Sequence, residues 1–113
     1  MTTLAVQCLS PDVAVAPQLT PAAMAEAAAQ GFKSVINNRP DLEGGADQPS
    51  SAAIEVAARA AGLDYCYLPV APNFQSADEI ARFGELLASL PKPILAFCRT
   101  GTRSGKLFRA VAG

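Results

Sequence analysis

The stretch ILAFCRTGTRSGKLF, residues 94–108, joins an apolar run to a polar loop and then to a second segment with spaced apolar residues. The run PILAF, residues 93–97, predicts a short buried strand, because its apolar residues follow one another without interruption. The loop CRTGTR, residues 98–103, contains a glycine that lets the backbone turn sharply. A helix is predicted from about residue 103 to the C-terminus. This strand–loop–helix unit places Cys98 at the carboxyl end of a strand.

The same alternation of strand and helix precedes this unit three times. Typical helix starts precede the predicted helices: Thr20 before Pro21, Ser50 or Ser51, and Ser76 with Glu79 three residues later. The order predicts a three-layer α/β fold, with a mainly parallel sheet of four to five strands and helices on both faces. The strands are expected at residues 12–16, 33–37, 64–70 and 93–97, and the helices between them at residues 21–30, 52–61 and 77–90.

Length and composition narrow the function classes. The 113 residues are expected to form one domain, 1–113, with about ten loose residues at the N-terminus. The net charge of -1 does not favour binding to nucleic acid or to an anionic membrane. Three cysteines, an odd number, argue against a disulfide framework and favour a cytoplasmic location. With no histidine and no Cys-x-x-Cys pair, we expect no metal or other cofactor, and no imidazole base.

The carboxyl ends of parallel strands meet at one edge of a sheet, where ligands bind. Cys98 lies at such an end, together with the loops at residues 38–48 and 71–75. Asp64 begins its strand and is expected at the opposite edge. The polar side chains expected near Cys98 are Arg39, Asp41, Glu43, Asp47, Asn73, Gln75 and Asp78.

The loop after the last strand is suited to hold a thiolate and an anion. It precedes a helix N-terminus, whose free N–H groups favour negative charge. Gly101 allows successive N–H groups to point inward, and the guanidinium groups of Arg99 and Arg103 add positive charge. Thr100, Thr102 and Ser104 can donate hydrogen bonds to the sulfur or to a bound oxyanion. We therefore expect a low pKa for the Cys98 thiol and a nucleophilic role for Cys98.

The alternative is that Cys98 is a small buried apolar residue without a chemical role. The surrounding Arg-Thr-Gly-Thr-Arg-Ser segment favours the functional interpretation. Packing is the better interpretation for Cys66, which alternates with tyrosines along a strand, while Cys8 belongs to no motif. Arg109 is interpreted as a solvated charge on the last helix.

The loop resembles the active loops of two groups of cysteine enzymes. Sulfurtransferases of the rhodanese kind have four residues between the cysteine and the arginine or its substitute, and cysteine-dependent phosphatases have five. Four residues separate Cys98 from Arg103, and Ser104 stands where a phosphatase has its arginine. Loop length alone therefore favours sulfur transfer.

The chain as a whole resembles the beta-lactamase-hydrolase-like family. The resemblance covers residues 12–111 and rests on the segments GFKSVINNRPDLE, QPS, AARAAGLDYCYLPV and PILAFCRTGTRSGKLF, in the family's order. It implies the fold of dual-specificity phosphatases, and the family has also been labelled a sulfurtransferase family. Family members can be fused to a metallo-hydrolase domain.

Two positions depart from the phosphatase pattern. Phosphatases commonly have histidine before the cysteine, where this chain has Phe97, and an acidic residue after a strand like YLPV, where it has Ala71-Pro72-Asn73. A phosphatase needs such an acid to protonate the leaving oxygen. Asp41 is the acid we select, with Glu43, Asp47 and Asp78 as alternatives. A simple surface pairing of Asp41 or Glu43 with Arg39 competes with that role.

Three functions follow from these observations. The first is hydrolysis of a small phosphate monoester, with Cys98 as nucleophile, Asp41 as acid, and the oxyanion held by Arg103, Arg99, the Thr100–Ser104 loop and Arg39. The second is rhodanese-like transfer of sulfur from a small donor through a Cys98 persulfide, which needs no acid. The third is a non-catalytic module that binds an anion or a partner.

Overall fold

The computed structural model describes residues 4–113 as an α/β fold with a five-stranded sheet. The strand order is β1-β2-β5-β3-β4, and the last four strands in this order are parallel. The strands are β1 Gln7–Ser10, β2 Val13–Ala16, β3 Ser34–Asn37, β4 Asp64–Tyr67 and β5 Ile94–Phe97; the helices are α1 Ala23–Ala29, α2 Ser51–Ala60, α3 Ala77–Ser89 and α4 Thr102–Ala112. The predicted fold class is confirmed.

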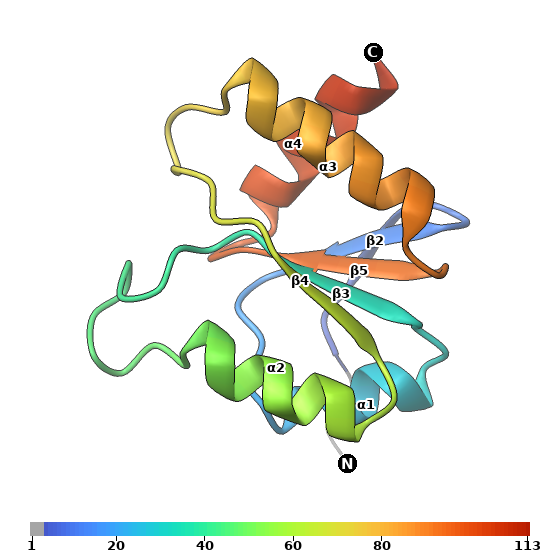
Figure 1. The fold of residues 1–113 in the computed structure, drawn as a ribbon, viewed down its shortest axis with the longest axis vertical. Helices are drawn as coiled ribbons and strands as arrows, with labels where there is room; N and C mark the ends of the chain where they lie inside the picture. The colour runs from blue at the N-terminus through green and yellow to red at the C-terminus, as the bar shows by residue number, and fades with distance from the viewer. Residues whose placement is uncertain (1–3) are drawn as a thin grey trace.

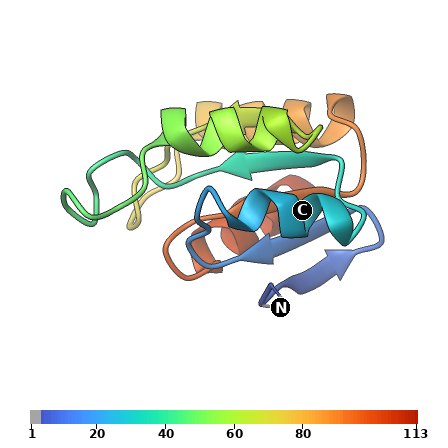
Figure 2. The same cartoon turned by 90° about the horizontal axis from the view of Figure 1, so that it is seen from below.

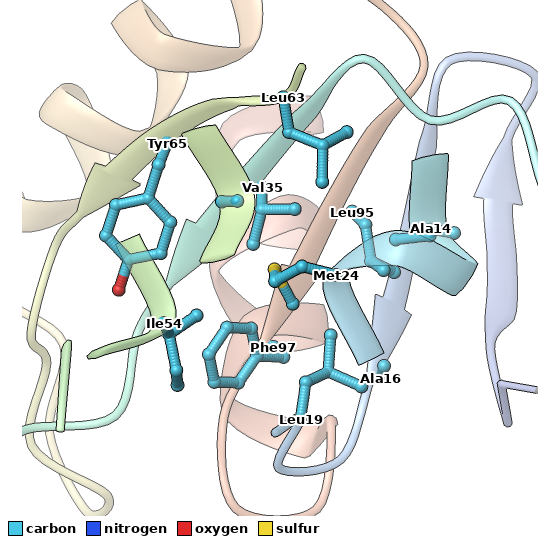
Figure 3. Close-up of a cluster of buried hydrophobic side chains, with 12 residues drawn as sticks. Ala14, Ala16, Leu19, Met24, Val35, Ile54, Leu63, Tyr65, Leu95 and Phe97 are labelled. Atoms are coloured by element: carbon cyan, nitrogen blue, oxygen red, sulfur yellow. The ribbon is translucent and has the colours of Figure 1, made fainter. Parts of the chain in front are cut away.

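The helices form a layer on each side of the sheet. Figure 1 shows α1 and α2 on one side and α3 and α4 on the other, and Figure 2 shows α1 beside the first strands of the chain. The central strand β5 supplies both apolar cores, because its side chains alternate between the two faces. Leu95 and Phe97 pack with α1 and α2, as Figure 3 shows, whereas Ile94 and Ala96 pack with the residues of α3 and α4.

Two helix starts follow from the predicted caps. The hydroxyl of Ser50 accepts the N–H of Ala53, and Ser76 forms a reciprocal capping box with Glu79. The first helix begins at Ala23 rather than at Pro21, although the Thr20 hydroxyl still accepts the N–H of Ala23.

The N-terminal region differs from expectation. Residues 7–10, which we expected to be loose, form the antiparallel edge strand β1 against β2. The Ser10 hydroxyl accepts the N–H groups of Asp12 and Val13, which stabilises the turn between the two strands. Residues 4–6 belong to no helix or strand, and the expectation for residues 1–3 lies outside the described residues.

The loops after β3, β4 and β5 leave the sheet on the same side (Figure 1). The predicted strand 64–70 ends at Tyr67, but the N–H groups of Leu68 and Val70 still donate to the backbone carbonyls of Asn37 and Asn38. These bonds hold the segment after β4 against the start of the segment after β3. Within the described part of the chain, every helix is too short or too polar to cross a membrane.

Candidate active site

A pocket of about 620 Å³ opens at the carboxyl edge of the sheet. Its lining comes from the loops after β3, β4 and β5 and from the first turns of α4. Four basic side chains face one carboxylate in this lining, so the formal charge is positive by three. The lining residues are Arg39, Glu43, Gly44, Pro72, Cys98, Arg99, Thr100, Thr102, Arg103 and Lys106.

The loop after β5 wraps around the sulfur of Cys98. Gly101 is the N-cap of α4 and has a φ of 91°, a backbone conformation that a residue with a Cβ adopts only with strain. In this conformation the N–H of Gly101 donates to Sγ of Cys98 at 3.1 Å. Cys98 is 1% exposed in total, yet it contributes to the pocket lining, so its sulfur can be reached through the pocket.

The loop favours the thiolate form of Cys98. Burial raises the pKa of the Cys98 thiol, but hydrogen bonds from the backbone N–H groups of Ser104, Thr100 and Gly101 outweigh burial and leave the pKa below its usual value. The Ser104 hydroxyl has one proton, which it donates to Oδ1 of Asn38 at 2.8 Å. We therefore assign the lowered pKa mainly to the backbone N–H groups, and the expected hydroxyl donation from Ser104 to sulfur or oxyanion is replaced by this bond to Asn38.

Arg103 is 6% exposed and is held by several acceptors. Its Nη1 donates to Oε1 of Glu43 at 3.0 Å and to the backbone carbonyl of Val70 at 3.0 Å, while Nη2 donates to Oε2 of Glu43 at 3.0 Å. The terminal fork of the guanidinium thus binds a carboxylate of the protein. Nε–H and the second N–H of Nη2 have no acceptor within residues 4–113, so one two-donor edge of Arg103 stays available.

Glu43 lies between two guanidinium groups. Besides its two bonds from Arg103, it accepts Nε of Arg39 at 2.9 Å. Burial raises the pKa of Glu43, but the hydrogen bonds and positive charges of Arg103 and Arg39 outweigh it and leave the pKa below its ordinary value. Glu43 is therefore ionised at neutral pH. The expected pairing of Glu43 with Arg39 is present, and it lies in the pocket rather than on an open surface.

The remaining substrate-binding candidates differ in exposure. Arg99, Thr100 and Thr102 are exposed and line the pocket, and Oγ1 of Thr100 donates to Oγ1 of Thr102 at 3.2 Å. Gly101 is buried and acts through its backbone. Arg39 lines the pocket, with Nη1 donating to Gln18.

The structure places the selected acid, Asp41, outside the pocket lining. Its Oδ1 accepts the N–H of Ser51 at 2.8 Å, so it binds the N-terminus of α2 instead of pointing toward Cys98. The other side chains expected near Cys98 that do not line the pocket are Asp47, Asn73, Gln75 and Asp78. An acid at Asp41 was inferred from the shared edge of the sheet, which brings whole loops together but does not orient each side chain.

Sequence reasoning missed Lys106, Pro72, Gly44 and Asn38. Lys106 lies four residues after Thr102, one turn along α4, so helical spacing could have indicated it. Asn38 is fully buried, and its Nδ2 donates to the backbone carbonyl of Leu68 at 3.0 Å. In residues 4–113, no group of three or more histidine, cysteine or acidic residues is placed to hold a metal ion.

The family model described as "Beta-lactamase hydrolase-like protein, phosphatase-like domain" matches residues 5–112. The chain belongs to this family. A beta-lactamase hydrolase-like protein of Agrobacterium fabrum is 44% identical over 81 residues, which cover 71% of this chain and 18% of that protein. One from Xylella fastidiosa is 37% identical over 81 residues, covering 72% and 19%. The matched 81 residues therefore cover less than a fifth of the length of these curated relatives.

Solved structures support the phosphatase-like fold. A protein of Neisseria meningitidis, described as a "putative phosphatase", is 34% identical with a TM-score of 0.84, covering 94% of this chain and 77% of its own. A Shewanella putrefaciens protein with the same description is 20% identical, with a TM-score of 0.80 and coverage of 96% and 68%. The protein Tk-PTP in its active form is 17% identical, with a TM-score of 0.64 and coverage of 95% and 80%.

Proposed function

We propose that this phosphatase-like domain transfers sulfane sulfur, with Cys98 as the nucleophile that carries the sulfur as a persulfide. The observation that carries this proposal is that the described part of the pocket lining has no carboxylic acid able to donate a proton. Among residues 4–113, Glu43 is the single carboxylate of the pocket lining, and two guanidinium groups hold it ionised. Hydrolysis of an alkyl phosphate needs an acid to protonate its leaving oxygen, whereas sulfite is stable as the anion that leaves.

The proposed reaction has two steps. The Cys98 thiolate attacks the outer sulfur of thiosulfate, the S–S bond of thiosulfate breaks, and sulfite leaves with the bonding electron pair. The product is a Cys98 persulfide anion. A thiophilic acceptor such as cyanide then attacks the terminal sulfur, and thiocyanate and the Cys98 thiolate are formed. No proton is transferred in either step, so the reaction suits a pocket without an acid.

The net positive charge of the pocket lining favours the anions of this reaction. The thiolate, the donor and the persulfide are all anions, and the lining carries an excess of three positive charges. The backbone N–H of Gly101, which lies 3.1 Å from Sγ of Cys98, stabilises negative charge on sulfur without giving up a proton. Arg99 and Lys106 stand in the exposed part of the lining, where a small donor enters.

Hydrolysis of phosphate monoesters is the second candidate. The phosphatase-like family and fold favour it, together with the free two-donor edge of Arg103, which matches two oxygens of a tetrahedral anion. Without an acid in the lining, it would be limited to esters with good leaving groups, such as aryl phosphates.

The deciding experiment runs two assays on the same preparation, thiocyanate formation from thiosulfate and cyanide, and phosphate release from an aryl phosphate. We expect thiocyanate formation in the wild type and none in Cys98→Ser. Cys66→Ser is the matched control, because Cys66 is half-buried outside the pocket and should leave the rate unchanged.

Each other outcome has a defined meaning. Phosphate release that depends on Cys98, without thiocyanate formation, would replace the proposal with the second candidate. Activity in neither assay would leave a non-catalytic anion-binding module. Thiocyanate formation that persists in Cys98→Ser would exclude Cys98 as the sulfur carrier.

A further inference from the structure

Glu43 occupies the terminal fork of Arg103, which is one of the two edges at which this guanidinium can bind an oxyanion. Its two carboxylate oxygens accept Nη1 and Nη2 of Arg103, each at 3.0 Å, in the fork arrangement that arginine also uses for phosphate. Its Oε2 also accepts Nε of Arg39 at 2.9 Å. A side chain of the protein thus takes the contacts that a tetrahedral substrate anion would otherwise compete for.

The backbone conformation before Glu43 sets the direction of its side chain. Leu42, the preceding residue, has a φ of 67°, a left-handed conformation that is unusual for a residue with a branched side chain. The Leu42 side chain is 72% exposed, so apolar burial does not explain this conformation. The backbone N–H of Asp41 donates to the Tyr67 hydroxyl at 2.8 Å. The chain is thus turned so that Glu43, rather than Leu42, points at the arginines.

Gly44 leaves room for the Arg39 guanidinium beside Glu43. A Cβ placed on Gly44 would lie 2.5 Å from Nη2 of Arg39, so Arg39 packs against the bare backbone. The N–H of Gly44 is bound by Oε1 of Gln48 at 2.7 Å. The loop from Arg39 to Gln48 is therefore shaped around the Arg39–Glu43–Arg103 group.

We propose that Glu43 tunes substrate specificity: its fixed carboxylate lowers the affinity of the pocket for doubly charged tetrahedral anions such as thiosulfate and phosphate more than its affinity for singly charged sulfur donors. This proposal rests on the proposed sulfur transfer for its substrate class, but the effect on anion binding does not depend on it. The single charge of Glu43 is shared between Arg39 and Arg103 and offsets one of the four positive charges of the lining, and its carboxylate repels a bound dianion. A monoanion is repelled about half as strongly.

The test compares two donors of similar shape and different charge. Methanethiosulfonate anion has one negative charge and releases methanesulfinate when the Cys98 thiolate takes its outer sulfur, whereas thiosulfate has two and releases sulfite. In Glu43→Gln we expect kcat/KM for thiosulfate to rise about tenfold relative to that for methanethiosulfonate, as one unit charge is removed close to the donor. Glu55→Gln is the matched control, because Glu55 forms an exposed pair with Arg59 on α2.

A second readout needs no turnover. Inorganic phosphate should protect Cys98 from iodoacetamide, and in Glu43→Gln the protecting concentration should fall about tenfold. A purely structural role for Glu43 predicts the opposite, because a misplaced Arg103 would weaken anion binding. Weaker or unchanged protection in Glu43→Gln would therefore overturn the proposal, whether or not either donor is turned over.

Glu43→Asp covers the case in which Glu43→Gln does not fold. Aspartate keeps the charge but is one methylene shorter, so its carboxylate is drawn back from the guanidinium groups of Arg39 and Arg103 and neutralises them less. We expect phosphate to protect this variant at about threefold lower concentration than the wild type. Equal or weaker protection would contradict the proposal. Failure of both donors in the wild type, with tighter phosphate binding in these variants, would overturn the sulfur chemistry and retain the role of Glu43 in anion binding.

Discussion

The hydroxyl of Ser104 donates to Oδ1 of Asn38 at 2.8 Å, and this bond joins the first turn of α4 to the end of β3. Both residues are fully buried. Asn38 also binds its neighbours on both sides: its backbone N–H donates to the carbonyl of Phe97, and its Nδ2 donates to the carbonyl of Leu68. One asparagine thus joins the segments that follow β3, β4 and β5.

Asn38→Ala should destabilise the domain by about 2 kcal/mol, because it leaves the buried Ser104 hydroxyl and the partly buried Leu68 carbonyl without their partner. Urea unfolding followed by circular dichroism measures this change. Ser104→Ala should cost less, about 1 kcal/mol, because Asn38 keeps its bond to Leu68. Asn73→Ala, at an exposed position, is the control. Equal stability of Asn38→Ala and Asn73→Ala would contradict the role of Asn38.

The Cys98 thiol should react with iodoacetamide at lower pH than an ordinary thiol, because its pKa is lowered by backbone N–H groups against the effect of burial. A protein with Cys8→Ser and Cys66→Ser leaves Cys98 as its single thiol, and its alkylation rate against pH reports the titration. The midpoint should lie below that of the same protein unfolded in urea. A midpoint above the unfolded value would mean that burial dominates.

The lowered pKa of Cys98 also sets the sign of a stability change with pH. Between the folded and the higher unfolded pKa, the unfolded chain binds more protons at this thiol, so stability rises as pH increases through that window. The contribution is complete above the unfolded pKa and is lost as pH falls through the folded one. The difference in unfolding free energy between wild type and Cys98→Ser should show this trend; a difference that decreases with pH would contradict it.

Gly101→Ala should destabilise the domain by about 1–2 kcal/mol, because alanine is strained at a φ of 91°. It should also raise the pKa of Cys98, since the N–H bond to sulfur depends on this conformation. Gly84→Ala is a matched control inside α3, where the new Cβ would meet Val111 at ordinary contact distance. That variant should be more stable by about 0.5–1 kcal/mol. Thermal unfolding and iodoacetamide titration measure both effects.

Tyr65→Phe should destabilise the domain by about 1–2 kcal/mol, because the Tyr65 hydroxyl bonds to Nδ2 of Asn37 and to Oγ of Ser51 in a buried site. Tyr67→Phe, which removes a hydroxyl bound to the exposed N–H of Asp41, should cost less than 1 kcal/mol. Chemical unfolding of the two variants provides the comparison. A larger loss of stability in Tyr67→Phe than in Tyr65→Phe would show that the bond from Asp41 to Tyr67 contributes more than the buried bonds of Tyr65.

Much of the fold could be predicted because its signals are local. Apolar runs such as residues 93–97, the Ser76–Glu79 capping box and the position of Gly101 each depend on residues a few places apart. Together they predicted four parallel strands and the helices between them. The edge strand β1 was missed, because an antiparallel edge strand is stabilised by its partner β2 and has no apolar run of its own.

The candidate site was predicted in its backbone and not in its side-chain partners. The sequence by itself determined the strand–loop–helix unit, the cysteine at the strand end and the N–H groups around it, because these follow from residues 94–104. Only the tertiary structure decided that Glu43 binds Arg103, that Asp41 instead binds the start of α2, and that Ser104 bonds to Asn38. These pairs lie 10 to 66 residues apart along the chain, and their contacts depend on side-chain direction within loops, which no local pattern specifies.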